Sequence, residues 1–292
     1  MKIAYIGAGD ALAETLIERM GQEGNDVYLL SDENFPQKPK GVSLQRFYRF
    51  YRSPKRGKSF EKLLCSIAPD VVIFAGNHYI GSAGGEESDA DVTLLARSLR
   101  AAATFPHVKF ILLSSTEVYG NTEGEAGESA ERTATDERGL RFNREEQLLT
   151  IYWKQYGMDV VILRASQLYS SRCREGRGDM LSRSFSAALQ AENSMPAYMF
   201  QPLHVSDFAD AVKRVMDAGK YRVYNVCGSA GISAERLYRL ICRQEKCEEK
   251  TIRWEKQDCI TLADSGRIRK ELGWSDFRNL EEQLPFLSLS RI

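Results

Sequence analysis

Short apolar runs alternate with longer amphipathic stretches along most of the chain. The run Phe110–Leu113 is continuously apolar, which is typical of a strand buried on both faces of a parallel sheet. Apolar positions recur at helical spacing in Ala11–Met20, Ser59–Ile67, Asp89–Ala103, Asn143–Tyr156, Asp207–Ala218 and Ser233–Gln244. The alternation predicts an α/β protein with a Rossmann-like, doubly wound parallel sheet.

The same pattern predicts how the chain is divided. Residues 1–166 are expected to form the Rossmann lobe, with a strand near residues 222–227 returning to it, and residues 167–292 to form a small C-terminal α/β lobe. The segment Asn121–Gly139, rich in Gly, Glu and Thr, predicts a long loop. The apolar tail Pro285–Ile292 either packs on the small lobe or belongs to one domain of a longer protein.

Composition and charge narrow the class of protein. Lys plus Arg and Asp plus Glu number 40 each, a balance that argues against a binder of bulk polyanions. No run of about 18 apolar residues occurs, and the sequence starts in a predicted strand without a signal peptide, so we expect a cytoplasmic protein without a membrane segment. The six cysteines form no CxxC pair and the three histidines are scattered, so no metal site is expected.

The residues after the buried strand carry the most specific motif. Ser114–Gly120 has the sequence Ser-Ser-Thr-Glu-Val-Tyr-Gly, which resembles the SS-x-x-VYG signature of the extended short-chain dehydrogenases/reductases, the NAD-dependent epimerase/dehydratase family. Other segments resemble the family in order and spacing: Lys2–Ile6, Gly7–Asp10, Asp26–Leu30, Asp70–Gly76, Val160–Ser166, His204–Ala209, Tyr224–Val226 and Glu271–Trp274. The resemblance therefore covers nearly the whole chain.

The resemblance implies a set of functional expectations. The Rossmann lobe would bind NAD, and the C-terminal lobe would hold the substrate, with a nucleotide or sugar nucleotide as the candidate ligand. Family members dimerise by packing two long helices of each subunit, here about Asp89–Ala103 and Arg144–Tyr156, into a four-helix bundle. Relatives often work in sugar-nucleotide metabolism and surface-polysaccharide biosynthesis, which suggests that context by analogy.

The family's proton-transfer pair is missing from this chain. Its Tyr-x-x-x-Lys motif lies on the next long helix and supplies the general acid/base and a lysine that lowers the pKa of the tyrosine. These two positions fall on Arg138 and Phe142. A guanidinium does not release a proton near neutral pH, and a phenyl ring carries no charge. The usual catalysis is therefore expected to be lost.

A remnant of the reaction centre is still present in Ser115, Glu117 and Tyr119. By the resemblance, Ser115 takes the place of the hydroxyl that contacts the substrate oxygen. Glu117 takes the place of a catalytic glutamate, although Thr116 stands where the sugar-nucleotide dehydratases have an aspartate. A relocated acid/base, with Tyr119, Tyr152 or Glu117 as candidates, would restore activity. Alternatively, this strand end preserves only the fold and the shape of the pocket.

The cofactor turn also departs from the family. The pattern Gly-x-x-Gly-x-x-Gly places Gly7, Asp10 and Ala13 at its three positions, while Gly7 and Gly9 fit the shorter Rossmann pattern. The Asp10 carboxylate would meet a pyrophosphate at the helix N-terminus. Two unit charges about 4 to 6 Å apart repel by roughly 3 to 4 kcal/mol at an effective dielectric near 20. Asp10 is also a good N-cap for the helix that begins at Ala11.

Residues near two other strand ends would complete a cofactor site. Ala75 and Gly76 end the strand that resembles the family's fourth. Asp32 follows the second strand and could accept hydrogen bonds from ribose hydroxyls, which would favour NAD over NADP. The alternative is that Ser31–Asn34 is simply a turn rich in local hydrogen bonds. NAD is thus the candidate cofactor, although the Asp10 carboxylate would repel its pyrophosphate.

Cations outside the motif offer further candidate contacts. The segment Arg46–Lys58 interleaves aromatic and basic residues, which could stack bases and contact phosphates or form an edge strand that leads into a basic turn. Tyr51 and Lys55 have the catalytic spacing, but Pro54 breaks the helix that would align them. Phe200 replaces a diphosphate-binding arginine of several relatives. The candidate replacements are Arg172, Arg174, Arg177 and Arg183.

Three hypotheses of function follow from these observations. The first is a catalytically degenerate domain, not an enzyme, that acts as a binding, regulatory or scaffolding module with a protein partner or further domain. The second is an active NAD-dependent epimerase, dehydratase or reductase with a relocated acid/base. The third is nucleic-acid binding through Arg46–Lys58.

Overall fold

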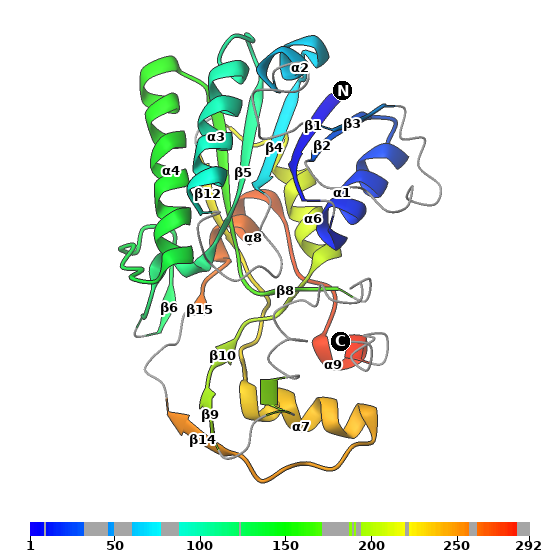
Figure 1. The fold of residues 1–292 in the computed structure, drawn as a ribbon, viewed down its shortest axis with the longest axis vertical. Coiled ribbons are helices and arrows are strands. Elements are labelled where there is room, and N and C mark those ends of the chain that lie inside the picture. The colour runs from blue at the N-terminus through cyan, green and yellow to red at the C-terminus, as the bar shows by residue number, and fades with distance from the viewer. Residues whose placement is uncertain are drawn as a thin grey trace.

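A seven-stranded parallel sheet forms the body of the protein in the computed structural model (Figure 1). Its strands follow the order β12-β7-β5-β4-β1-β2-β3, so the chain winds outward in both directions from β1. The described residues are 1–8, 10–31, 46–49, 60–76, 88–122, 124–170, 187–188, 190, 194–219, 222–256 and 262–284. The predicted α/β, doubly wound Rossmann-like fold is confirmed.

The central strands match the apolar runs of the sequence. The strands are β1 (Lys2–Gly7), β2 (Asp26–Ser31), β3 (Arg46–Arg49), β4 (Val71–Gly76), β5 (Lys109–Ser115), β7 (Asp159–Ala165) and β12 (Arg222–Val226). All seven residues of β5 are buried, as expected for a strand covered on both faces. The strand β3 pairs only with β2 and forms the edge, and the side chains of Arg46–Lys58 lie outside the described residues.

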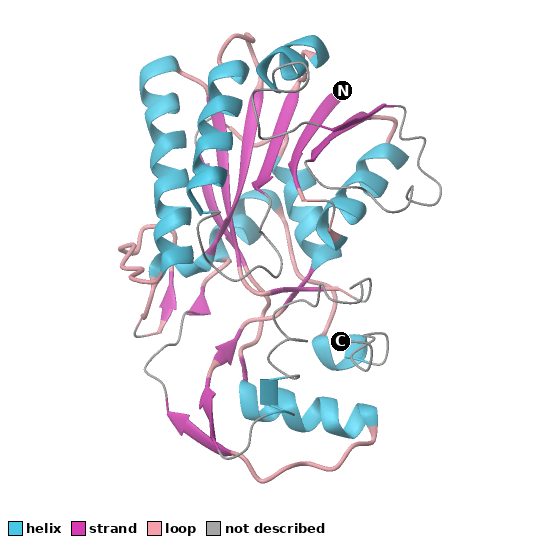
Figure 2. Cartoon of the chain, viewed as in Figure 1, coloured by secondary structure: helices cyan, strands magenta, loops and turns pink. Residues whose placement is uncertain are grey.

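Helices cover both faces of the sheet (Figure 2). One face packs against α1 (Ala11–Gln22) and α6 (Val205–Val215), and the other against α2 (Phe60–Ile67), α3 (Ser88–Ala102) and α4 (Glu137–Tyr156). Alternate residues of each strand enter opposite cores, as with Phe110 and Ile111 in β5. Among the described residues, no helix is both long and apolar enough to cross a membrane.

Shorter elements build the lower part of the molecule in Figure 1. Its longest helix, α7 (Ala234–Glu245), packs against β9 (Ser194–Ala197), and β9 pairs in parallel with β14 (Arg253–Lys256). The other short elements are β6 (Glu125–Ala126), β8 (Leu168–Tyr169), β10 (Met199–Phe200), β11 (Leu203–His204), β13 (Ile232–Ser233), β15 (Leu262–Ala263), the 3-10 helix η1 (Thr116–Tyr119), α8 (Gly266–Leu272) and α9 (Leu280–Gln283).

The helix α4 begins earlier than its apolar periodicity predicts. It starts at Glu137, six residues before Asn143, so the end of the predicted long loop is helical. The Asp136 carboxylate caps the helix by accepting a hydrogen bond of 2.9 Å from the Gly139 amide. A Cβ atom at Gly139 would lie 2.6 Å from the Glu117 carbonyl oxygen, so a glycine allows this first turn to press against η1. Because this first turn is polar and contains a glycine, the sequence shows no helical spacing of apolar residues there.

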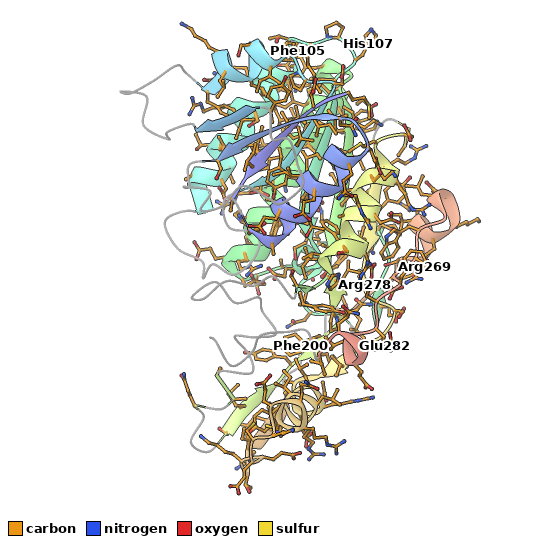
Figure 3. The ribbon with its side chains drawn as sticks, turned by 90° about the vertical axis from the view of Figure 1, so that its right-hand side faces the viewer. Phe105, His107, Phe200, Arg269, Arg278 and Glu282 are labelled. Carbon is orange, nitrogen blue, oxygen red and sulfur yellow. The ribbon has the colours of Figure 1, made fainter. Side chains whose placement is uncertain are left out.

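The first turn of α6 anchors the C-terminal segment to the sheet. The buried Asp207 carboxylate accepts hydrogen bonds from the backbone amides of Phe277 and Arg278, at 3.2 and 3.0 Å, and pairs with the Arg278 guanidinium. The Trp274 indole donates to the Asp207 carbonyl at 2.9 Å. Arg269 and Arg278 come from this segment and lie on the same side of the molecule (Figure 3).

A buried ion pair joins α4 to the centre of the sheet. The Arg164 guanidinium, on β7, donates from Nε and Nη2 to the two Glu146 carboxylate oxygens at 2.9 and 2.7 Å. The same carboxylate accepts from the Ser114 hydroxyl at 2.7 Å and from Arg132 at 3.0 Å. Burial alone would lower the pKa of Arg164, but the hydrogen bonds that it donates to the Glu146 carboxylate hold that pKa above its usual range.

The network continues from Arg164 into β12. Its Nη1 donates to the Tyr119 hydroxyl at 2.7 Å, and that hydroxyl donates to the Asn225 side-chain oxygen at 2.6 Å. The Asn225 side-chain nitrogen donates to the Ala126 and Asp264 carbonyls at 2.8 and 3.1 Å. The strands β5, β7 and β12, the helix α4 and the strand β6 are therefore held at one end of the sheet.

We expect Glu146→Gln to destabilise the fold strongly, because it leaves the Arg164 guanidinium buried without its counter-charge. The expected loss in the free energy of unfolding is about 3 to 5 kcal/mol, measured by urea denaturation. Glu137→Gln, on an exposed position of the same helix, should cost less than about 1 kcal/mol. Equal losses in the two variants would contradict a dominant role for the buried pair.

Candidate functional site

The turn after β1 is closed by the end of β4. The Ala8 amide donates to the Gly76 carbonyl at 3.0 Å. A Cβ atom at Gly7 would lie 2.7 Å from that carbonyl oxygen and 3.0 Å from the Ala75 side chain. Glycine is therefore needed at position 7 for backbone packing, whether or not a phosphate approaches. Gly9 lies outside the described residues.

Asp10 caps α1, as one of the two interpretations of the sequence predicted. Its backbone is extended (φ −98°, ψ −175°), and its carboxylate accepts a hydrogen bond of 2.9 Å from the Ala13 amide. The Ala13 side chain is fully buried in the core. The N-terminus of α1 thus already carries a negative charge, which is hydrogen-bonded to a backbone amide of the first turn. Asp32 lies outside the described residues.

The end of β4 faces a buried carboxylate on α3. Ala75 is buried, and Gly76 has φ +67°, a left-handed conformation that glycine adopts without strain. A Cβ atom at Gly76 would lie 3.2 Å from the Asp91 carboxylate. That carboxylate is fully buried and pairs with the Arg141 guanidinium at 2.8 Å. A buried ion pair therefore lies beside this strand end.

Arg138 and Phe142, which the sequence resemblance assigned to the family's tyrosine and lysine positions, have different environments. Arg138 lies in the first turn of α4, and its Nε is 2.9 Å from the Glu117 carboxylate, with both side chains about one-quarter exposed. The two charges therefore balance each other at the strand end. Phe142 is fully buried, and the Arg141 guanidinium lies over its ring at 4.3 Å from the centroid, a favourable cation–π geometry.

Glu145 extends the charged cluster one turn along α4. Its carboxylate is buried and lies 3.9 Å from Arg141 Nη1, and its Oε1 atom has no hydrogen-bond partner among the described residues. Burial, reinforced by the nearby carboxylates of Asp91 and Glu146, raises the pKa of Glu145 to about 8. A carboxyl group with this pKa carries its proton at neutral pH. Asp91, Arg141 and Glu145 thus hold one negative and one positive charge between them.

Ser115 and Thr116 show two different hydrogen-bonding states. The Ser115 hydroxyl accepts from the Glu117 amide at 3.2 Å and caps η1. The Thr116 hydroxyl is buried and has no hydrogen-bond partner within the described part of the chain. Among the described residues, no hydrogen bond joins either hydroxyl to Arg138.

The tyrosines proposed as a relocated acid/base are poorly placed for that role. Tyr119 is fully buried, with its hydroxyl between Arg164 and Asn225, and burial raises its pKa above the ordinary value. Tyr152 lies 14 residues beyond Arg138 on α4, which is about 21 Å along the helix axis. It packs against Tyr156 with ring centroids 5.0 Å apart. Of the two candidates in η1, Tyr119 is buried within the Arg164 network and Glu117 pairs with Arg138.

The sequence interpretation missed the buried charges that organise this site. Arg164, Asp91, Arg141, Glu145 and Glu146 are all buried. Arg164 gave a usable signal, because a single arginine within the apolar run Val160–Ala165 must find a partner. The helical residues gave none, since charged residues on a helix are usually solvent-exposed. Among the described residues, no group of three or more His, Cys, Asp or Glu could hold a metal ion. Arg172, Arg174, Arg177 and Arg183 lie outside the described ranges.

The chain and its fold match known proteins. The model of the NAD dependent epimerase/dehydratase family matches residues 6–227. The structure of UDP-glucose 4-epimerase from Thermus thermophilus in complex with NAD has a TM-score of 0.80 at 17% identity, covering 100% of this chain and 98% of that chain. UDP-glucose 4-epimerase from Thermotoga maritima with UDP-glucose has a TM-score of 0.79 at 17% identity, with the same coverage.

A third structural neighbour is UDP-glucuronic acid 4-epimerase from Bacillus cereus in complex with NAD, with a TM-score of 0.78 at 19% identity over 98% of this chain and 97% of that chain. At these identities the structural likeness establishes the fold. No curated protein sequence matches the chain. The family model covers most of the chain and includes the Ser-Ser-Thr-Glu-Val-Tyr-Gly motif, and on that evidence the protein belongs to the NAD-dependent epimerase/dehydratase family.

Proposed function

We propose that this protein is a catalytically degenerate member of its family that binds a nucleotide or sugar nucleotide without converting it. The observation that carries the proposal is the replacement of the proton-transfer pair by Arg138 and Phe142. Arg138 is engaged by Glu117 at 2.9 Å, and Phe142 is buried under the Arg141 guanidinium. A sugar hydroxyl in this site would lack the proton acceptor that the family ordinarily uses.

The ligand class is supported by the family and by the solved relatives. The titles of three neighbours name UDP-glucose 4-epimerase, UDP-glucuronic acid 4-epimerase and dTDP-glucose 4,6-dehydratase. We therefore place the protein in sugar-nucleotide metabolism, with polysaccharide biosynthesis as the finer context. Within this proposal, residues 1–166 with β12 form the dinucleotide-binding-like lobe and residues 167–292 form a small remnant of the substrate lobe. The protein as a whole acts as a binding, regulatory or scaffolding module.

We also place the protein in the cytoplasm. The four cysteines within the described residues, Cys65, Cys227, Cys242 and Cys247, are free thiols. Free thiols are the usual state in the reducing cytosol, where structural disulfides are rare.

We expect no epimerisation, dehydration or reduction of UDP- or dTDP-sugars with added NAD or NADP, because Arg138 and Phe142 cannot exchange a proton at neutral pH. Product analysis by nuclear magnetic resonance after prolonged incubation tests this. Activity that Glu117→Gln abolishes, but that the matched exposed change Glu137→Gln preserves, would reveal a relocated acid/base and refute the degenerate assignment.

The Asp10 cap should weaken binding of NAD. We expect the unmodified chain to bind NAD weakly, and Asp10→Gly to bind it some hundredfold more tightly, since a repulsion of roughly 3 to 4 kcal/mol is removed. The fold should lose only a few tenths of a kcal/mol, because glycine is an acceptable N-cap. Calorimetric titration measures both affinities.

Asp136→Gly provides the matched control for this titration, because Asp136 caps α4 in the same way and should leave NAD affinity unchanged. Tight NAD binding by the unmodified chain would show that the carboxylate does not oppose the pyrophosphate. An equal gain in both glycine variants would point to a general effect of losing a helix cap.

We propose a homodimer formed through α3 and α4. Several apolar residues of these two helices are not available for a contact between subunits. Leu94, Leu95, Leu99 and Leu149 are buried within the subunit. Along α4, Leu140 and Ile151 are exposed at 44% each, and Tyr156, the last residue of the helix, at 63%. Large exposed apolar side chains gathered on one helix are typical of an interaction surface.

Light scattering at tens of micromolar should give the mass of a dimer, and Ile151→Glu should convert it to a monomer because it places a charge within the contact. Phe277→Glu is the matched control, since Phe277 is 67% exposed and lies outside the helix pair. A monomeric mass for the unmodified protein would refute the dimer and leave this face free for another protein.

A further inference from the structure

The C-terminal end of α7 brings two cysteines together. Lys246 has φ 54° and ψ 37°, a left-handed conformation, and its amide donates to the Arg243 carbonyl at 3.4 Å. The next amide, that of Cys247, donates to the Cys242 carbonyl at 3.1 Å. This pair of hydrogen bonds defines a Schellman motif, in which the side chains of the first and last residues commonly contact each other. Here those residues are Cys242 and Cys247.

The two thiols differ in exposure and lie within reach of each other. Cys242 is 1% exposed and packs in the core of the small lobe, whereas Cys247 is exposed. Burial raises the pKa of the Cys242 thiol to about 11, and hydrogen bonding to the Cys247 thiol contributes to the increase. The Tyr238 hydroxyl, one turn earlier on α7, lies on the same side and accepts the Lys250 amide at 3.0 Å.

We propose that Cys242 and Cys247 form a redox-sensitive pair that closes to a disulfide when the protein meets a peroxide. The exposed Cys247 thiolate attacks one peroxide oxygen, the O–O bond breaks, and Cys247 becomes a sulfenic acid while the second oxygen leaves as hydroxide and takes up a proton to form water. The Cys242 thiol then attacks the Cys247 sulfur, and water leaves as the S–S bond forms. One peroxide thus takes the two thiol hydrogens, and two water molecules are released.

The backbone favours this pair over the other described cysteines. A disulfide requires Cα atoms about 4.4 to 6.8 Å apart, and the Schellman turn holds the two backbones together by a direct hydrogen bond. Cys65 lies on α2, and Cys227 is buried beside Ser265, which donates a hydrogen bond to its carbonyl. Neither Cys65 nor Cys227 is close in sequence to another described cysteine, and neither belongs to this turn. Pairing of this transient kind suits a cytosolic protein.

The new bond would fasten α7 to the segment that leads into β14. Cys242 belongs to the core formed by α7, β10 and β13, and Trp254 of β14 packs against this core. The Tyr238 and Trp254 rings lie 6.1 Å apart in the same layer. Oxidation would therefore fix the end of α7 relative to β14, at the side of the small lobe away from the main sheet (Figure 1).

The test uses the intact protein treated with hydrogen peroxide, followed by maleimide blocking of the remaining thiols. Trypsin cleaves after Arg239, Arg243, Lys246 and Lys250, so the disulfide would join the peptides Leu240–Arg243 and Cys247–Lys250. Mass spectrometry without reductant should find this linked species, lighter than the two free peptides by two hydrogen atoms. Reductant should separate it into both peptides.

Two variants make the result specific. Cys247→Ser, at an exposed position that should not disturb folding, should abolish the linked species and leave Cys242 inaccessible to maleimide in the folded protein. Cys65→Ser should leave the linked species unchanged. The proposal is overturned if peroxide converts Cys247 only to sulfinic or sulfonic acid while Cys242 keeps its thiol, or if Cys242 is found linked to another cysteine in the folded protein.

Discussion

The buried contact between Arg164 and Glu146 is the interaction on which the geometry of the strand ends depends. An arginine in a strand buried on both faces must be neutralised and fully hydrogen-bonded. Glu146, Tyr119 and the Glu128 carbonyl accept hydrogen bonds from its nitrogens. Meeting that requirement fixes α4 against the sheet and fixes the direction in which its first turn faces. The position of Arg138 beside Glu117 is a consequence of that helix placement.

Near this end of the sheet, charged side chains form ion pairs or are neutralised by protonation. Arg138 balances Glu117, Arg141 balances Asp91, and the neighbouring Glu145 has a pKa of about 8 and stays neutral. In the low-dielectric interior each arrangement avoids an isolated ion, whose desolvation would be costly. The carboxylates of Glu117 and Asp91 therefore each lie beside a cationic side chain at this end of the sheet.

Local sequence signals predicted the features that depend on neighbours along the chain. The strand Phe110–Leu113 and the N-cap at Asp10 could both be inferred from short segments. The start of α4 could not, because its polar first turn is stabilised by Asp136 and by contact with η1. The raised pKa of Glu145 was equally hidden, since it results chiefly from burial of the carboxyl group in the fold. The features that the sequence pattern did not predict depend on contacts between side chains that are distant along the chain.

The position of Arg141 restricts which side chains position 142 can carry. Its guanidinium lies 4.3 Å from the centre of the Phe142 ring and pairs with Asp91. A lysine placed at position 142 would bring a second cation into the same buried space. Two like charges about 4 Å apart repel by roughly 4 kcal/mol at an effective dielectric of 20. A lysine at position 142 would thus need a prior change at Arg141, so the two neighbouring positions depend on each other and the order of substitutions at them matters.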